Sequence, residues 1–372
     1  MKAHPKLGRE IRRIKDQLNS WAMRIYEPWM RRQRERHPSR YMLIHEGGLP
    51  NPGKLAIYLV YQPKGLGLST LRALQHFQQH GYAVFLVSNA PLDNADLERA
   101  RPHCWKLMER NNFGYDFGGY QDAIRHMWSA KLHPTHLVII NDSIWFPLHD
   151  KCDLLERMEQ SPSSFTGAFQ LEPTRRRNPK GKKRPFMGSF FWHFKQEALE
   201  TPAFAAFWND YKATSSKYAT IRRGERRFTH HMQDAGVSIE GLFSRHQFDE
   251  WLNCLEVEEL KLALSDLCTT DHQVNERRQK LLLAASLDTD WKMEALTLAK
   301  AITESQNIMA TAPIFMVREM GLPFLKKAID PANLLALECL TEHSASRDWI
   351  DELVLSEITI RLGDRQQASE RA

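Results

Sequence analysis

The sequence has no long hydrophobic run and few cysteines. None of its apolar stretches approaches the roughly 18 residues of a membrane-spanning helix, and the first residues lack the apolar core of a secretory signal peptide. The five cysteines are scattered, and no two form a Cys-x-x-Cys pair, which argues against a zinc site and a disulfide framework. We therefore expect a cytoplasmic protein whose thiols are free.

An excess of positive charge is concentrated near the N-terminus. The net charge is +6 over 372 residues, and residues 1–40 hold much of it. Pro28 is expected to end or kink a helix whose apolar residues recur at helical spacing: Leu7, Ile11, Ile14, Leu18, Trp21, Ala22 and Ile25. Such a helix suits an anionic membrane surface, or equally a terminal helix that packs on its own domain. Because no nucleic-acid-binding module accompanies it, we expect no nucleic-acid partner.

Alternating strand and helix patterns predict a parallel sheet. Leu55–Tyr61 and Ala83–Val87 are typical of buried strands, and the helical pattern Leu68–His80 lies between them. A strand, a helix and a strand at this spacing form a βαβ unit with parallel strands. The same patterns predict helices over Asp93–Arg101, Leu154–Met158 and Phe204–Tyr211, and strands over Cys104–Met108, Phe165–Phe169 and Phe186–Phe194.

A strand that ends in polar side chains marks the first candidate site. The apolar run Leu137–Ile140 is followed by Asn141, Asp142 and Ser143. In open α/β sheets, ligands lie outside the carboxyl ends of the strands. A carboxylate between an amide and a hydroxyl suits a divalent cation or the hydroxyls of a ribose. The alternative is an Asx turn that only ends the strand.

A glycine-rich stretch, Asn112–Tyr120 (NFGYDFGGY), precedes this strand. Its glycines let a ligand approach the backbone closely. The helical spacing of Tyr120–Trp128 predicts that a loop here opens a helix. The stretch matches neither the dinucleotide fingerprint nor the P-loop. Asp116 within it has two interpretations, a helix cap or a contact to a nucleotide or sugar.

A carboxylate also lies near the predicted start of a later helix. Phe228, Met232 and Ala235 share one helical face, the helix is expected to end at Gly236, and Glu225 lies at its expected N-terminus. The positive end of a helix dipole favours an ionised carboxylate, which makes this glutamate a candidate general base. The alternative is an ordinary acidic residue at a helix start.

Two further stretches complete the organisation of the chain. Thr174–Pro185 (TRRRNPKGKKRP) is either a solvated charge run or a lid over phosphates or an acidic acceptor. Beyond Arg245 the patterns become helical, over Glu256–Leu267, Asn275–Ala285, Trp291–Ala301 and Asp330–Thr341. We predict three parts: a basic amphipathic N-terminal helix region (1–50), a sheet domain (51–250) and a helical C-terminal region (251–372).

The order of these features resembles the GT-A glycosyltransferases. It resembles more closely the rhamnan synthesis protein F family of bacterial polysaccharide glycosyltransferases. The resemblance is carried over roughly residues 55–245 by Asn112-Phe113-Gly114-Tyr115-Asp116-Phe117-Gly118-Gly119-Tyr120, by Asn141-Asp142-Ser143 followed by Pro147, and by Gly224-Glu225 in the helix after Ile221. Asn307-Ile308-Met309 and Gly321–Lys326 resemble the C-terminal part of such proteins.

The resemblance implies an α/β fold of GT-A-like, Rossmann type, with a mostly parallel sheet and flanking helices. It implies a nucleotide-sugar-dependent glycosyltransferase of hexosyl or rhamnosyl type. The family name suggests rhamnose as the sugar, whereas the residues themselves specify none. The acceptor would be a growing surface polysaccharide or a lipid-linked glycan of the cell envelope, at the inner face of the cell membrane.

The resemblance also assigns roles to residues. Asn112, Gly114 and Asp116, together with Asn141 and Ser143, would bind the donor. Asp142 would coordinate a divalent metal, Mg²⁺ or Mn²⁺, or the ribose if no metal binds. Glu225 would deprotonate the acceptor hydroxyl. The family's common metal motif is Asp-x-Asp, whereas here only Asp142 is acidic. The alternative function is therefore a non-catalytic scaffold of the same fold in a polysaccharide assembly system.

Overall fold

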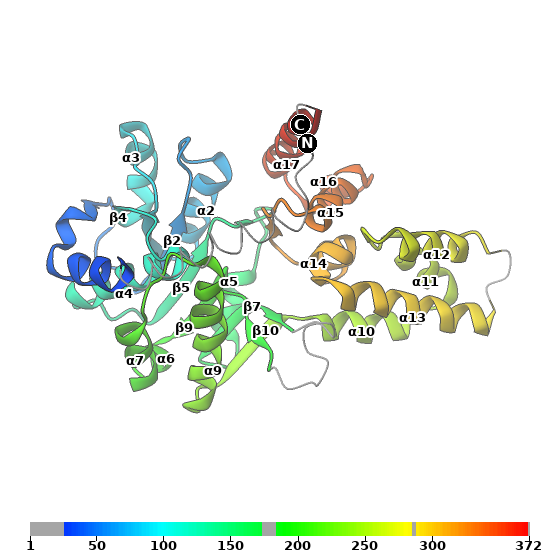
Figure 1. Ribbon diagram of the computed structural model, residues 1–372, viewed down its shortest axis with the longest axis horizontal. Helices are drawn as coiled ribbons and strands as arrows, with labels where there is room; N and C mark the ends of the chain where they lie inside the picture. Colours follow the sequence, from blue (N-terminus) through cyan, green and yellow to red (C-terminus); the bar gives the residue numbers. More distant parts are fainter. Residues whose placement is uncertain (1–25, 173–183, 285–287, 371–372) are drawn as a thin grey trace, which may run out of the picture.

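A computed structural model describes residues 26–172, 184–284 and 288–370 (Figure 1). Among these residues nine strands form one sheet, in the order β1-β4-β3-β2-β5-β9-β7-β10, with β8 paired to β7. The strands of this sheet are β1 (Met42–Glu46), β2 (Lys54–Val60), β3 (Tyr82–Ser88), β4 (Cys104–Arg110), β5 (His136–Asn141), β7 (Phe165–Leu171), β8 (Phe186–Met187), β9 (Phe191–Lys195) and β10 (Ile239–Phe243). A second, two-stranded sheet joins β6 (Ile144–Trp145) to β11 (Leu325–Lys326).

Helices surround both sheets. A helix over residues 26–36 precedes β1. The helices of the sheet region are η1 (Pro38–Arg40), α2 (Leu68–Gln79), α3 (Asn94–Ala100), η2 (Arg101–His103), α4 (Tyr115–Ser129), α5 (Leu154–Gln160), α6 (Gln196–Leu199), α7 (Pro202–Asp210), α8 (Lys217–Thr220), the π-helical η4 (Ile221–Arg226) and α9 (Arg227–Asp234). Those of the C-terminal region are α10 (Arg245–Cys254), α11 (Val257–Ser265), α12 (His272–Leu282), α13 (Thr289–Ser305), α14 (Ile308–Thr311), η5 (Phe315–Glu319), α15 (Pro331–Glu342), α16 (Ser346–Trp349) and α17 (Glu352–Glu370).

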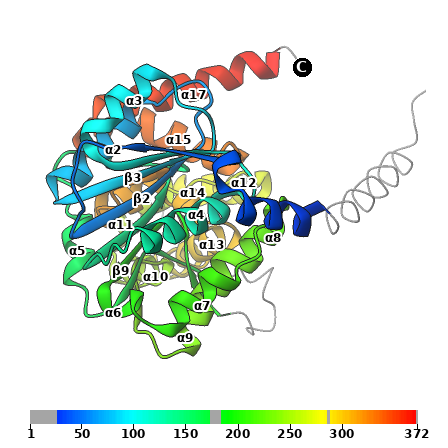
Figure 2. The same ribbon diagram turned by 90° about the vertical axis from the view of Figure 1, so that its left-hand side faces the viewer.

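The predicted α/β class and parallel pairing are confirmed. The central strands β4, β3, β2 and β5 are parallel neighbours, and β9 joins β5 in the antiparallel sense. Residues of β2 alternate between the two faces: Ala56, Tyr58 and Val60 pack with α2 and α5, whereas Leu55, Ile57 and Leu59 pack with α4, α7 and α9. Figure 2 shows these helices in layers on either side of the sheet.

Three local predictions are wrong, and the reasons are visible in the backbone. Phe186–Phe194 is two strands, β8 and β9, because the backbone turns at Ser189-Phe190. A loop does open a helix in the glycine-rich stretch, but the helix starts earlier than the spacing from Tyr120 indicated, since α4 already begins at Tyr115. The helix that carries Glu225 begins at Lys217 and runs without a break through α8, η4 and α9. Glu225 is therefore not at a helix N-terminus, and the dipole argument does not apply to it.

Only part of the predicted N-terminal helix and of the basic stretch lies within the described residues. The apolar residues of the predicted helix up to Ile25, and residues 174–183 of the basic stretch, lie outside the described residues. Pro28 lies inside the helix 26–36 and does not end it. That helix packs on the sheet domain: Arg34 donates hydrogen bonds to Asn111 and to Asp122 (Nη2 to Oδ2, 2.6 Å). Strands β1 and β10 were not predicted, and the three-part division of the chain stays a prediction.

Candidate functional site

The end of β5 is held in a tight polar turn. Oδ1 of Asn141 accepts hydrogen bonds from the main-chain N–H of Ser143 (3.1 Å) and from its hydroxyl (2.5 Å). This is the Asx turn that the sequence offered as an alternative. It uses the amide of Asn141 and leaves the neighbouring carboxylate of Asp142 for other contacts. The turn and a ligand site are therefore compatible.

Asp142 connects the carboxyl ends of two adjacent strands. Its Oδ2 accepts hydrogen bonds from the main-chain N–H of Tyr61 (2.8 Å) and from Nε2 of Gln62 (3.1 Å), which follow β2. Its own N–H donates to the carbonyl oxygen of Leu59 at 3.0 Å. Parallel strands bring their carboxyl ends to one edge of a sheet. The half-buried carboxylate of Asp142 lies at that edge, as predicted.

Asp116 lies beside this turn, in the first turn of α4. Nδ2 of Asn141 donates to Oδ2 of Asp116 (3.2 Å) and to the hydroxyl of Tyr120 (3.0 Å). The N-cap of α4 is Gly114, with no side-chain cap, so the capping interpretation of Asp116 is wrong. Burial, and then the nearby charges of Asp142 and Glu225, raise the pKa of Asp116 to about 6.

The other two residues predicted from the glycine-rich stretch have different surroundings. Gly114 has φ +83°, and a Cβ there would lie 2.8 Å from Cβ of Ala213. A glycine is therefore required for the backbone itself. The side-chain oxygen of Asn112 is buried and accepts no hydrogen bond within the described part of the chain. The structure does not join Asn112 to the polar cluster around Asp142.

Glu225 reaches the same cluster from the π-helical segment η4. Its Oε1 accepts hydrogen bonds from the N–H (2.7 Å) and hydroxyl (3.0 Å) of Ser189. The carbonyl oxygen of Ser189 accepts in turn from the hydroxyl of Tyr120 at 3.1 Å. Burial raises the pKa of Glu225, while the hydrogen bonds from Ser189 and the charge of Lys326 oppose that rise. A continuous chain of contacts thus joins Asn141 to Glu225.

Close helix packing positions Glu225. Gly224 lies against the ring of Phe117 in α4, where an added Cβ would come within 2.6 Å of the ring. π-helical segments are uncommon and often occur at functional sites. The small residue and the wide helical turn together bring the glutamate next to Asp116, whose pKa its charge raises.

Two lysines from the C-terminal region complete the cluster, and sequence reasoning missed their roles. Strand β11 pairs with β6, so that Lys326 lies opposite Ile144. Nζ of Lys326 lies 3.1 Å from the centre of the Phe190 ring. Burial lowers the pKa of Lys326 to about 7, although the charges of Glu225 and Asp116 oppose the shift. The available signal was the Lys-Lys pair after the apolar run Leu322–Leu325.

Lys327 directly follows β11 and has different contacts from those of Lys326. Its Nζ donates to the hydroxyl of Ser69 at 3.3 Å, and burial lowers its pKa, against the charges of Glu357 and Asp142. Glu357 accepts hydrogen bonds from Ser69 and from the indole of Trp145. Helices α2 and α17 therefore both support this lysine.

A large cavity opens beside these groups. It has a volume of about 1220 Å³ and is lined by residues of the sheet domain and of the C-terminal region. Ser143, Lys326 and Lys327 belong to its wall, together with Lys217, Arg226 and Arg245. These five cations outnumber the three acids of the lining, Glu172, Glu304 and Asp330. The excess of positive charge suits an anionic ligand such as a diphosphate.

The side-chain oxygens of this site suit a divalent cation only when a bound ligand also contributes atoms that coordinate it. The described residues contain no group of three or more His, Cys, Asp or Glu side chains that could hold a metal ion by themselves. Asp142 offers hard carboxylate oxygens at the sheet edge. Mg²⁺ commonly binds to one or two carboxylates together with substrate phosphates, and this residue fits such shared coordination.

Three further observations concern membrane-spanning helices, the basic stretch and the cysteines. Of the helices that the structure describes, none is both long and apolar enough to cross a membrane. Arg184, the one residue of the basic stretch before Pro185 that the structure describes, pairs with Asp234 (Nη1 to Oδ1, 2.7 Å). All five cysteines are free, as predicted.

Comparisons with known proteins show a match to a family model and similarity to a bacterial protein. Residues 84–259 match the model of a protein family described as Rhamnan synthesis protein F. A protein of Sinorhizobium fredii (strain NBRC 101917 / NGR234), named Uncharacterized protein y4gN, is 32% identical over 265 residues, which are 70% of this chain and 66% of that protein. The match therefore spans just under two thirds of that relative's length.

Two solved structures show weaker likeness. A mannosyltransferase, PcManGT from Pyrobaculum calidifontis in complex with GDP-Man and Mn²⁺, is 12% identical with a TM-score of 0.33, over 93% of this chain and 96% of that one. A glycosyltransferase involved in glycosylation of the major capsid of PBCV-1 is 12% identical with a TM-score of 0.27, over 53% of this chain and 98% of that one.

Proposed function

Since residues 84–259 match the model of the rhamnan synthesis protein F family, we propose that the chain is a glycosyltransferase. It would move a sugar, rhamnose by the family name, from a nucleotide-sugar donor to a growing surface polysaccharide or lipid-linked glycan. The observation that carries the proposal is the meeting of Asp142, Asp116, Glu225 and Lys326 at the carboxyl end of β5.

In this proposal the donor binds at the edge formed by β2 and β5. Asp142, oriented by the N–H of Tyr61 and by Gln62, would hold the ribose, or Mg²⁺ or Mn²⁺ shared with the donor's phosphates. A bound metal ion would supply positive charge to the leaving diphosphate. Asp116, Asn141 and Ser143 would shape the donor pocket.

The charges of this chain's own residues support departure of the nucleotide. Breaking the bond between the anomeric carbon and the diphosphate oxygen leaves negative charge on the phosphates. Lys326 and Lys327, at the wall of the 1220 Å³ cavity, would stabilise that charge electrostatically. Their low pKa values come from burial, and a bound diphosphate would favour their charged forms.

Glu225 is the proposed general base. A carboxylate with a raised pKa is a better proton acceptor at neutral pH than an exposed one. The acceptor hydroxyl would form the new bond to the anomeric carbon while its proton passes to Glu225, in an inverting displacement. The proposed setting, the inner face of the cell membrane, rests on the basic residues within 1–40 and on the family resemblance.

The test is a calorimetric and thermal-shift screen of nucleotide diphosphates and nucleotide-sugars, with and without Mg²⁺ or Mn²⁺. We expect one nucleotide series to bind saturably, and Asp142→Ala to weaken that binding. Asp348→Asn, at an exposed position of α16, is the matched control and should bind like the parent protein. A well-folded sample that binds no nucleotide under any metal condition would exclude the transferase function. Binding without sugar transfer would favour the scaffold alternative.

A further inference from the structure

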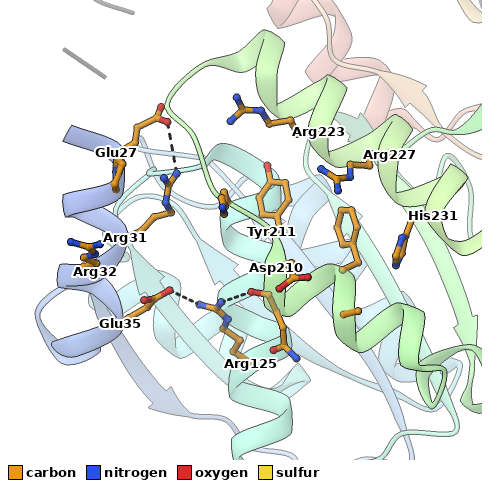
Figure 3. A pocket seen from close by; sticks show the side chains of 15 residues that line it. Glu27, Arg31, Arg32, Glu35, Arg125, Asp210, Tyr211, Arg223, Arg227 and His231 are labelled. Carbon is orange, nitrogen blue, oxygen red and sulfur yellow. Dashed lines mark hydrogen bonds and ion pairs between the residues drawn. The ribbon is translucent and has the colours of Figure 1, made fainter. Parts of the chain in front are cut away.

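A second cavity lies on the side of the sheet that α4 and α7 cover. Its walls are the helix 26–36, α4, the segment 206–212 and the helical run of η4 and α9 (Figure 3). Its volume is about 950 Å³. It shares no lining residue with the cavity beside Ser143, so it is separate from the proposed donor site.

The lining of this second cavity is cationic. Five arginines and one lysine face three acids. The cations are Arg31, Arg32, Arg125, Lys212, Arg223 and Arg227, and the acids are Glu27, Glu35 and Asp210.

Two of the acids are already engaged. Oε2 of Glu27 lies 3.8 Å from Nη1 of Arg31, and its Oε1 accepts hydrogen bonds from Thr214 and Ser215. Oε1 of Glu35 lies 3.9 Å from Nη1 of Arg125. Most of the positive charge in the cavity is therefore left without an acidic partner among the described residues.

Arg223 and Arg227 make the strongest case for a bound anion. They lie four residues apart on one continuous helical run, are exposed, and line the same cavity. Like charges at this spacing destabilise a helix. Within the described ranges neither arginine forms an ion pair. An anion held between them would turn this repulsion into two charge-assisted contacts.

The geometry points to phosphate groups as the ligand, and we propose that this cavity binds a phosphate-bearing anion. Guanidinium groups match phosphate oxygens in paired hydrogen bonds, and arginine is favoured wherever phosphate is recognised by shape and charge. The walls come from four segments that are distant in the sequence. The ligand would bridge the helix 26–36 to the helix that carries Arg223.

Exposed aromatic residues on the helix 26–36 indicate which phosphates to test. Tyr26 and Trp29 are 46% and 53% exposed, and their ring centres lie 5.9 Å apart on the helix that carries Arg31 and Arg32. Aromatic side chains beside basic ones are typical of helices at a membrane interface. A lipid headgroup and a free phosphate offer the same chemistry, so the experiment contains both.

The experiment uses the full chain with Lys326→Met and Lys327→Met as background, so that diphosphate binding at the other cavity does not contribute. Inorganic diphosphate is titrated by calorimetry. Vesicles of phosphatidylcholine, with and without phosphatidylglycerol, are tested by co-sedimentation. Arg223→Gln/Arg227→Gln is compared with Arg36→Gln/Arg222→Gln, which removes the same charge from exposed positions outside the cavity.

We expect the cavity variant to lose about tenfold or more in affinity, as the loss of charge-assisted contacts to phosphate implies, and the control variant to lose much less. Loss confined to anionic vesicles assigns the site to lipid headgroups, and loss with diphosphate assigns it to soluble phosphates. The proposal is overturned if the background protein binds neither probe. It is equally overturned if the two double variants bind alike, since net charge alone would then explain binding.

Discussion

The main-chain N–H of Lys327 donates a hydrogen bond to the carbonyl oxygen of Ser143, with 2.7 Å between the two atoms. This contact joins residues 184 positions apart in the sequence. It extends the pairing of β11 with β6 and fixes both lysines beside the polar end of β5. The helical C-terminal region thus supplies charge to the candidate site as well as a wall of the cavity.

The first prediction concerns the charge of Lys326. Because its pKa is lowered to about 7, this lysine loses its positive charge as the pH rises through that value. We expect the affinity for a nucleotide diphosphate to fall over the same range, and Lys326→Met to remove much of this pH dependence. Calorimetric titrations on both sides of neutrality measure it. Lys280→Met, at an exposed position of α12, is the control, and an unchanged pH dependence in Lys326→Met would contradict the prediction.

The second prediction concerns Glu225. Glu225→Gln should reduce sugar transfer by about 10²–10⁴-fold, the usual contribution of a general base, and leave nucleotide binding nearly unchanged. In the parent protein the rate should fall as the pH drops through the raised pKa of Glu225, because the protonated acid accepts no proton. The charge of Lys326 holds this pKa down, so Lys326→Met should move the acid side of the profile to higher pH. If the acid side of the pH profile does not move in Lys326→Met, the charge of Lys326 does not act on Glu225, which would contradict the prediction.

The third prediction concerns metal binding. We expect Mg²⁺ and Mn²⁺ alone to bind weakly, because the described residues offer Asp142 without a group of three metal-binding side chains. Metal and nucleotide diphosphate should bind together, and Asp142→Ala should weaken this by about tenfold, near the value of one charged contact. Asp142→Asn keeps an acceptor for the N–H of Tyr61 and so tests the charge alone. Tight metal binding without nucleotide would show that other ligands exist.

The sequence predicted the sheet well, because its core strands are buried on both sides. Such strands appear as continuous apolar runs, and Leu137–Ile140 is one of them. The polar residues that follow must then lie at the carboxyl edge, which placed Asp142 correctly. The family resemblance built on these features is confirmed by the match over residues 84–259.

The features of the fold and of the site that the sequence did not predict depend mostly on contacts between residues that are distant in the chain. Strand β1 pairs only at an edge and has a half-exposed pattern, so its signal is weak. The helical pattern placed a helix start at Glu225, whereas the helix begins at Lys217 and Gly224 within it packs closely on Phe117. Nothing local indicates that Lys326 meets Glu225, because that meeting depends on the pairing of β11 with β6. The roles of Asp116, Asp142 and Glu225 in catalysis stay predictions.

The last prediction concerns the packing that positions Glu225. In Gly224→Ala the new Cβ would lie 2.6 Å from the Phe117 ring, which stacks on Trp208 and contacts Trp192 and is almost fully buried. Because the ring has little room to move, we expect a loss of about 1–3 kcal/mol in the free energy of unfolding, the range for an overpacked core. Gly363→Ala is the matched control, since this helical glycine in α17 has nothing within 4 Å of an added Cβ. It should stabilise the protein by up to about 1 kcal/mol through helix propensity. Urea denaturation of the two variants measures the difference, and a Gly224→Ala protein as stable as Gly363→Ala would show that α4 and η4 can separate without cost.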